Sequence, residues 1–240
     1  MKKLFLSAIL LIFVNALYAQ EGTTNIGFNV GFAEPTEYYR PNNSTDKLSK
    51  NVTNGVKIGA IYETNLIKGF GVSMSLNYAF SANVGAYQPI NAGMEFPQTK
   101  TDQYYHFLEL PVDWQYKFLI AKHTYLGLYT GPTLQIGLSN NFVKYKKISK
   151  TASETAEVID AYKIDDDKDD IPDYNRVNVT WGVGAVFQYK RYFIRGGYDF
   201  GIMPLYRDRY YNLTSDSGWN RKGRLDQWQI KLGIYLWELK

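Results

Sequence analysis

Apolar and polar residues alternate along eight segments of the chain. The clearest segment is residues 70–80, where six large apolar side chains are separated by Gly, Ser, Asn and Ala. The other seven segments lie within residues 26–32, 56–63, 108–118, 126–138, 178–188, 192–202 and 227–236. Alternation with a period of two predicts β-strands. Each segment has about ten residues, the length of a tilted strand that crosses a membrane.

The connections between these segments alternate in length. Residues 64–69, 119–123 and 190–191 form short connections. Residues 34–53, 81–102, 139–176 and 204–224 form long ones that are rich in Asn, Asp, Ser, Thr, Lys and Pro. Short turns at one end and long loops at the other are typical of outer-membrane barrels. With the N-terminus left in the periplasm, the long loops are predicted to be extracellular.

The first residues of the chain predict a secretory signal peptide. Lys2 and Lys3 precede an apolar run over residues 4–14, and Ala19 is followed by Gln20. A basic start, a short apolar core and a small residue before a polar one are typical of a cleavable signal. The apolar run is too short to cross a bilayer as a helix. We therefore expect a signal peptide over residues 1–19 and an outer-membrane β-barrel over residues 20–240.

The two faces of the predicted strands differ in polarity. One face carries large apolar and aromatic residues, and the other carries Gly and charged residues. A secreted eight-stranded barrel of the lipocalin kind would have the opposite arrangement, with apolar residues inside. Exposing the apolar face to water would be very unfavourable, so that face is predicted to contact lipid. The fold predicted is all-β, an eight-stranded antiparallel up-and-down transmembrane β-barrel integral to an outer membrane.

Aromatic residues at the strand ends are expected to form interfacial girdles. They are Tyr62, Phe70, Phe80, Tyr116, Phe118, Tyr189 and Tyr192.

The composition agrees with a barrel and excludes some other classes. Mean hydropathy is −0.33, and no apolar run after the signal approaches the length of a spanning helix, so an α-helical membrane protein is excluded. A β-barrel can be polar on average because only alternate residues meet lipid. Removal of Lys2 and Lys3 leaves 25 Lys and Arg against 23 Asp and Glu. This near-neutral balance argues against a nucleic-acid partner. There is no Cys, so disulfides do not stabilise the chain.

Charged residues also occupy the predicted lumen face. They are Lys57, Glu63, Glu109, Asp113, Lys117, Arg195, Asp199 and Lys231. Eight strands enclose an interior just wide enough to be filled by side chains, so these charges must pair or stay hydrated. The balance of four acids and four bases favours a network that plugs the barrel. The alternative is a selective pathway for ions or protons.

Two prolines interrupt the predicted strands. Proline cannot donate a hydrogen bond to a sheet, and a closed barrel has no edge where that loss is harmless. A hairpin centred near residue 121 would bring Pro132 close to Glu109 and Pro111. Two missing donors in one neighbourhood predict a bulge or bend, which could admit water beside Glu109.

The third long loop contains a run of acidic residues. Asp165, Asp167, Asp169 and Asp173 have the alternating spacing that can wrap oxygen ligands around Ca²⁺. The run resembles the calcium repeats of thrombospondin type 3. It departs from them at Asp170, where the repeat has Gly, and at Arg176, where it has the closing acid. The hypotheses are a weak Ca²⁺ site and a solvated acidic loop.

Basic and aromatic residues gather in the last long loop. They are Tyr206, Arg207, Arg209, Tyr210, Tyr211, Trp219, Arg221, Lys222 and Arg224. Such a cluster suits lipopolysaccharide phosphates or a protein partner, and the alternative is a hydrated loop without a partner.

One stretch resembles a known family. Residues 104–112 read Tyr-Tyr-His-Phe-Leu-Glu-Leu-Pro-Val. This is similar to the Tyr-x-x-x-Leu-Glu-Ile-Pro signature of outer-membrane barrel proteins from Bacteroidota, the PorT-like or porin-family proteins. The resemblance implies an eight-stranded barrel and, for PorT itself, a part in protein secretion by the type nine system. The final residues, Trp237-Glu238-Leu239-Lys240, depart from the terminal aromatic typical of barrel assembly signals.

Nothing in the spacing predicts catalysis. The only histidines are His106 and His123, and neither can be paired with a nucleophile. We therefore expect a non-enzymatic barrel with a charge-plugged lumen, structural or binding a partner through its long extracellular loops. The alternatives are a secretion accessory, a narrow channel and a lipid-modifying enzyme. No cofactor is expected apart from the possible Ca²⁺.

Overall fold

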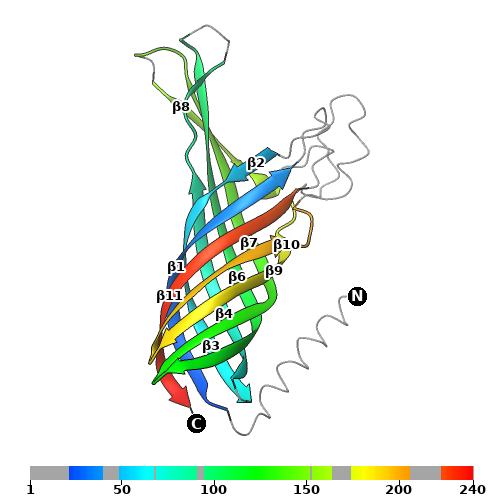
Figure 1. The fold of residues 1–240 in the computed structure, drawn as a ribbon. Coiled ribbons are helices and arrows are strands. Elements are labelled where there is room, and N and C mark those ends of the chain that lie inside the picture. The colour runs from blue at the N-terminus through cyan, green and yellow to red at the C-terminus, as the bar shows by residue number, and fades with distance from the viewer. Residues whose placement is uncertain are drawn as a thin grey trace.

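Eight long antiparallel strands form a closed barrel (Figure 1). The computed structural model describes residues 22–39, 49–67, 69–90, 95–151, 153–163, 174–205 and 223–239. The barrel strands are β1 (Thr24–Tyr39), β3 (Asn54–Ile67), β4 (Phe70–Asn83), β6 (Gln98–Ala121), β7 (Thr124–Lys147), β9 (Val177–Tyr189), β10 (Tyr192–Gly201) and β11 (Arg224–Leu239). The predicted signal peptide lies outside the described residues. None of the helices described is long and apolar enough to cross a membrane.

Each barrel strand pairs with its neighbours in the chain, and the ring closes where the last strand meets the first. β11 pairs with β1, with Phe28 opposite Ile234 and Val30 opposite Leu232. The short connections are tight turns, in which His123 and Lys190 have positive φ angles of 60° and 53°. The ring leaves no barrel strand with an unpaired edge, which is how a sheet satisfies its backbone in lipid. The predicted up-and-down topology is confirmed.

The exposed and buried residues alternate as predicted. On the outer face, Leu128 is 62% exposed and Ile58 is 60% exposed. On the inner face, Glu109 is 1% exposed and Arg195 is also 1% exposed. The wall therefore places its apolar side chains outward and its polar side chains inward, the polarity of a barrel solvated by lipid.

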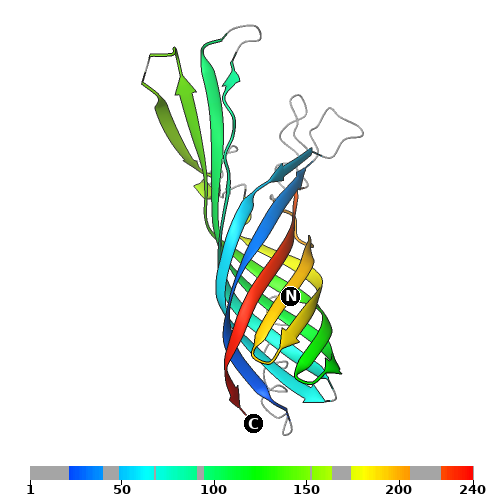
Figure 2. The same ribbon diagram turned by 60° about the vertical axis from the view of Figure 1, so that its left-hand side comes forward.

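Two strands are much longer than predicted and leave the barrel together. β6 and β7 have 24 residues each, so residues 98–102 and 139–147, predicted as loop, are strand. At the outer end β7 also pairs with β8 (Thr155–Asp160), and β6 with β5 (Gln88–Pro89). Figure 2 shows this sheet, called the arm below, projecting beyond the barrel. The apolar alternation stops near Leu138 because the arm has no lipid to face, while backbone pairing continues.

Two smaller elements lie at the same end of the barrel. β2 (Ser49–Val52) pairs with the end of β1, and the 3₁₀ helix η1 (Ala161–Lys163) follows β8.

Of the bulge or bend predicted at Pro111, the bulge is absent. The pairing of β6 with β4 and with β7 has gaps beside Pro111 and Pro132, but the register is the same on both sides of each gap. The register shifts of the β6–β7 pair lie instead near His106 and near Leu119. Glu109 is fully buried next to this gap. The missing donors cost ladder hydrogen bonds without adding a residue to either strand.

Candidate functional site

All eight charged residues assigned to the lumen lie inside the barrel, and each is at most 7% exposed. Six of them form three ion pairs. Lys57 Nζ lies 2.5 Å from Glu109 Oε2, Arg195 Nη2 lies 2.7 Å from Asp113 Oδ2, and Lys117 pairs with Glu63. Each pair joins strands that are not neighbours in the ring, so the pairs reach across the interior.

Amide side chains complete the network around Glu109. Gln135 Nε2 and Gln227 Nε2 each donate to Glu109 Oε1 over 3.0 Å. Gln229 accepts from Lys57 over 3.1 Å and donates to Asp199 over 2.7 Å. These glutamines were missed as members of the network because they carry no charge. Their signal was their place on the polar face of the strands, where β7 has Gln135 and β11 has Gln227 and Gln229 two residues apart.

Asp199 and Lys231 are not joined to each other. Asp199 accepts hydrogen bonds from Gln229 and, over 3.2 Å, from Gln227. Within the described part of the chain, Lys231 has neither a hydrogen bond nor an ion pair, although it is only 5% exposed. Of the eight charged residues predicted to form a network, six therefore form three ion pairs, Asp199 is bound by amides, and Lys231 stands apart.

Arg195 is held at the middle of the barrel by three groups. It donates to Asp113 over 2.7 Å and to Ser73 Oγ over 2.5 Å. Its guanidinium carbon also lies 4.3 Å from the ring centroid of Tyr129. The Tyr129 ring occupies space that a Cβ on Gly184 or Gly197 would fill. The paired glycines of β9 and β10 thus make room for the Tyr129 ring, on which the Arg195 guanidinium stacks.

An apolar cluster closes the outer end of the lumen. It consists of Ala79, Tyr105, Phe107, Ala161, Tyr162, Tyr174, Leu205 and Leu225, and we call it the cap. Phe107 is completely buried, and its ring stacks on that of Tyr105 at a centroid distance of 4.5 Å. Lys57 Nζ lies 6.0 Å from the Phe107 centroid, so the cap directly adjoins the ion pairs. Sequence patterning missed the cap because several of its members lie in predicted loops.

Tyr162 of η1 belongs to the cap. It lies in the barrel mouth, where the chain folds back after β8. Its ring fits against Gly137 of β7, where a Cβ would overlap the ring and hydroxyl. Arg176 covers the ring with its guanidinium carbon 4.8 Å from the centroid, and the Arg176 carbonyl accepts from the Gly137 amide over 2.7 Å. Burial raises the pKa of the Tyr162 phenol to about 12, so this residue stays neutral at physiological pH.

We expect Gly137→Ala to displace Tyr162 and to lower the free energy of unfolding by about 1–3 kcal/mol, because the added methyl overpacks a filled site. Urea unfolding of the refolded barrel measures the loss. Gly196→Ala is the matched control, since a Cβ there meets nothing closer than 3.9 Å. Equal stability of the two variants would contradict the packing of Tyr162 on Gly137.

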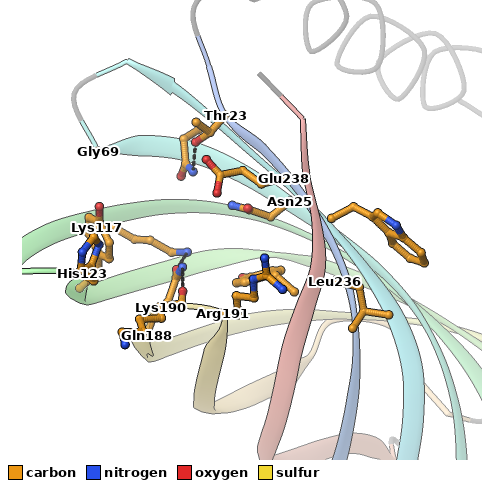
Figure 3. Close-up of a pocket in the computed structure, with 14 residues that line it drawn as sticks. Thr23, Asn25, Gly69, Lys117, His123, Gln188, Lys190, Arg191, Leu236 and Glu238 are labelled. Carbon is orange, nitrogen blue, oxygen red and sulfur yellow. Dashed lines mark hydrogen bonds between the residues drawn. The ribbon is translucent and has the colours of Figure 1, made fainter.

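A pocket of about 630 Å³ lies at the opposite end, among the short turns (Figure 3). Its lining includes Lys117 and Gln188 on the lumen side, Lys190 and Arg191 from the β9–β10 turn, and Glu238 near the end of β11. Lys117 is already bound there to Glu63 and, over 2.6 Å, to Gln188. The pocket therefore ends inward at a closed ion pair.

Two other predicted sites fall partly or wholly outside the described residues. Asp165, Asp167, Asp169 and Asp173 are outside them, so Ca²⁺ binding stays a prediction. In the ranges that the structure describes, no group of three or more His, Asp and Glu side chains could hold a metal ion.

Of the basic and aromatic cluster in the last loop, Arg224 is described. It pairs with Asp226 over 3.0 Å, and its guanidinium carbon lies 5.3 Å from the Tyr38 ring centroid.

A closed antiparallel barrel with an apolar exterior and a packed polar interior defines the class of integral outer-membrane barrels. Residues 18–207 match the family model described as outer membrane protein beta-barrel domain. The chain belongs to this family, and its location is the outer membrane.

Several solved structures are similar to the chain at low identity. Ail of Yersinia pestis has 14% identity over 90% of this chain and 99% of its own, with a TM-score of 0.40, and one Ail structure holds the heparin analogue sucrose octasulfate. Neisserial surface protein A has 9% identity over 87% and 97%, with a TM-score of 0.38. The N-terminal barrel of Pseudomonas aeruginosa OprF has 10% identity over 86% and 97%, with a TM-score of 0.29. No curated protein matches the chain.

Proposed function

We propose that this protein is a non-enzymatic outer-membrane barrel with a closed lumen, which binds a protein partner through the arm. The observation that carries the proposal is the division of the molecule into a filled barrel and a sheet that extends outward from it. Three ion pairs and the cap occupy the interior, while β6 and β7 continue beyond the wall.

The filled interior argues against transport. Glu109 alone contacts Lys57, Gln135 and Gln227, which come from three different strands. An ion crossing the barrel would have to break these contacts and also displace Phe107 and Tyr162 from the cap. Breaking a buried ion pair leaves charges uncompensated at a cost of several kcal/mol. Such a barrier opposes rapid conduction.

The arm offers a surface suited to a protein partner. On one of its faces, Lys100 Nζ lies 4.5 Å from the Tyr145 ring centroid and 5.4 Å from that of Tyr87. Val158 of β8 lies on the same face and is 65% exposed. In the described residues β8 pairs only with β7, which leaves its other edge available to a further strand. Aromatic residues are enriched at protein interfaces, and an unpaired strand edge can pair with a strand of a partner.

We expect the refolded barrel to show no unitary conductance in planar bilayers. The physical reason is the barrier presented by the lumen contacts, and the measurement is current recorded at both polarities of applied voltage. Steady channel steps that change in Glu109→Gln would contradict the closed lumen and favour the narrow channel. Steps that persist unchanged in that variant would indicate leakage around the protein.

Other roles are separated by a deletion strain. The secretion role rests on the resemblance of residues 104–112 to the PorT-like signature, and loss of secreted cargo in the strain would support it. An altered lipid A mass spectrum would support the lipid-modifying enzyme instead. If both are normal, both alternatives are rejected.

Two ligand hypotheses concern the outer loops. Ca²⁺ binding by the acidic run is tested by calorimetry on the refolded barrel, where no heat at millimolar Ca²⁺ rejects it. Lipopolysaccharide binding by the basic and aromatic cluster is tested with Arg207→Gln and Arg209→Gln, which should weaken it.

A further inference from the structure

We propose that the pocket among the short turns binds the phosphate headgroup of a membrane phospholipid from the periplasmic leaflet. Short turns of outer-membrane barrels face the periplasm, so the pocket lies at the level of that leaflet. The site is at the opposite end of the barrel from the arm, and the inference is independent of the proposed function.

Two cations of the pocket are available to an anion. Lys190 and Arg191 are exposed, and neither forms an ion pair with any residue that the structure describes. The turn that carries them is fixed by its backbone. The Lys190 amide donates to the His123 carbonyl over 2.8 Å, and the Arg191 carbonyl accepts from the Tyr235 amide over 2.8 Å. Both side chains therefore start from defined positions at the pocket wall.

The Asn25 amide opens onto the pocket and can donate to a ligand in the same place. Asn25 of β1 is 8% exposed and lines the pocket, and its side chain makes no hydrogen bond within the described ranges. Figure 3 shows Asn25 directed across the pocket toward the side where Lys117 and Gln188 lie. A phosphate oxygen at this point would accept from the Asn25 amide.

The charges of the pocket match a headgroup that carries both signs. Glu63 neutralises Lys117, which leaves Lys190 and Arg191 against the carboxylate of Glu238. Two cations suit a phosphate, which guanidinium and ammonium groups bind by charge-assisted hydrogen bonds. The carboxylate at the rim suits the ammonium of an ethanolamine headgroup. The pocket thus has complementary positions for both ends of phosphoethanolamine.

The rim of the pocket identifies a lipid as the source of the phosphate. Leu236 and Trp237 line the pocket and are 39% and 55% exposed. Figure 3 shows Leu236 on the outer side of β11, away from the polar groups. The pocket therefore reaches from polar groups inside the rim to the lipid-facing wall. A phospholipid seated there would place its acyl chains against Leu236 and Trp237, whereas free phosphate would gain nothing from them.

The test measures binding to the refolded full barrel in a detergent without phosphate. The three probes are dihexanoylphosphatidylethanolamine below its micellar concentration, glycerophosphoethanolamine and inorganic phosphate, each titrated by calorimetry. We expect saturable binding of the lipid, at least tenfold tighter than binding of either soluble probe. Arg191→Gln should weaken lipid binding about tenfold and Asn25→Ala about fivefold, by loss of one donor each. Lys144→Gln on the arm is the control and should leave binding unchanged.

The outcomes separate the proposal from its rivals. Absence of saturable lipid binding overturns it, as does equal weakening by Lys144→Gln and Arg191→Gln. Inorganic phosphate binding as tightly as the lipid overturns the assignment to a phospholipid. Urea unfolding of each variant shows that it is folded, and Arg191→Lys provides a second check. This variant keeps the charge and should retain more affinity than Arg191→Gln, and equal loss in both would overturn the role of charge.

Discussion

Asp113→Ala is expected to lower the free energy of unfolding of the barrel by about 3–5 kcal/mol, the cost of leaving one partner of a buried ion pair uncompensated. Arg195 is 1% exposed and has one carboxylate in contact with it. Without Asp113 the guanidinium keeps the Ser73 hydroxyl and the Tyr129 ring, neither of which carries a negative charge. Asp113 is itself 4% exposed, so little water can replace the lost partner.

Urea unfolding in lipid vesicles, followed by tryptophan fluorescence, measures this loss. Lys150→Ala is the control, because the Lys150–Glu95 pair is exposed to solvent and its removal should have no measurable effect. The double variant Asp113→Leu, Arg195→Met should recover most of the stability, since replacing both charges with apolar groups is often neutral or stabilising. If the single variant loses less than about 1 kcal/mol, water must reach Arg195 and the lumen is not closed.

Phe107→Ala is expected to cost a similar amount, about 3–5 kcal/mol, through the cavity that it opens in the cap. Phe107 is completely buried, stacks on Tyr105 and lies next to Lys57. Removing the ring takes away the surface on which Tyr105 stacks and opens a cavity in the cluster that contains Tyr162. The effect should be largest at the barrel mouth and should not extend to the short turns.

Two measurements check this expectation. Urea unfolding measures the total loss, and Phe107→Leu, which keeps most of the volume, should lose no more than about 1.5 kcal/mol. Hydrogen exchange at the Gly137 amide measures the local effect, because that amide donates to the Arg176 carbonyl beside Tyr162. Faster exchange at Gly137 with unchanged exchange at Tyr235 is the expected pattern. Unchanged exchange at both positions would contradict the role of Phe107 in holding the cap.

Most strands of the barrel wall were predictable because the local sequence of each strand reflects whether a side chain faces lipid or the lumen. Residues 70–80 alternate strictly, and the structure exposes Leu76 while burying Asn77. A period of two assigns each side chain to a face without knowledge of any other strand. The arm was not predictable in this way. Beyond Leu138 the alternation is interrupted by residues 139–141 and returns only over residues 143–146, although the strand continues to Lys147.

In the lumen, the inward positions could be predicted from the sequence, but the contacts between them could not. Alternation was enough to place Lys57 and Glu109 inside, but not to pair them. Pairing depends on the stagger of β3 and β6, which are separated by β4. Four acids and four bases predicted a balanced network but not its partners, and Asp199 is bound by two glutamines. The pocket and the cap depend on residues such as Asn25 and Tyr162, whose roles follow from neighbours far along the chain.

Local sequence patterns were enough to establish the class of this protein, because they located the strands and the polarity of their faces and thereby predicted a lipid-solvated barrel. The export signal over residues 1–19 stays a prediction. These properties follow from local chemistry, because lipid and the crowded lumen select residue types one position at a time. The folded structure was needed to show that β6 and β7 leave the barrel as an arm and that Tyr162 lies in the barrel mouth. It also decided that Asn25, Lys190 and Arg191 surround one pocket. Those features depend on the stagger of strands around a closed ring, a property of the whole sheet that no single segment contains.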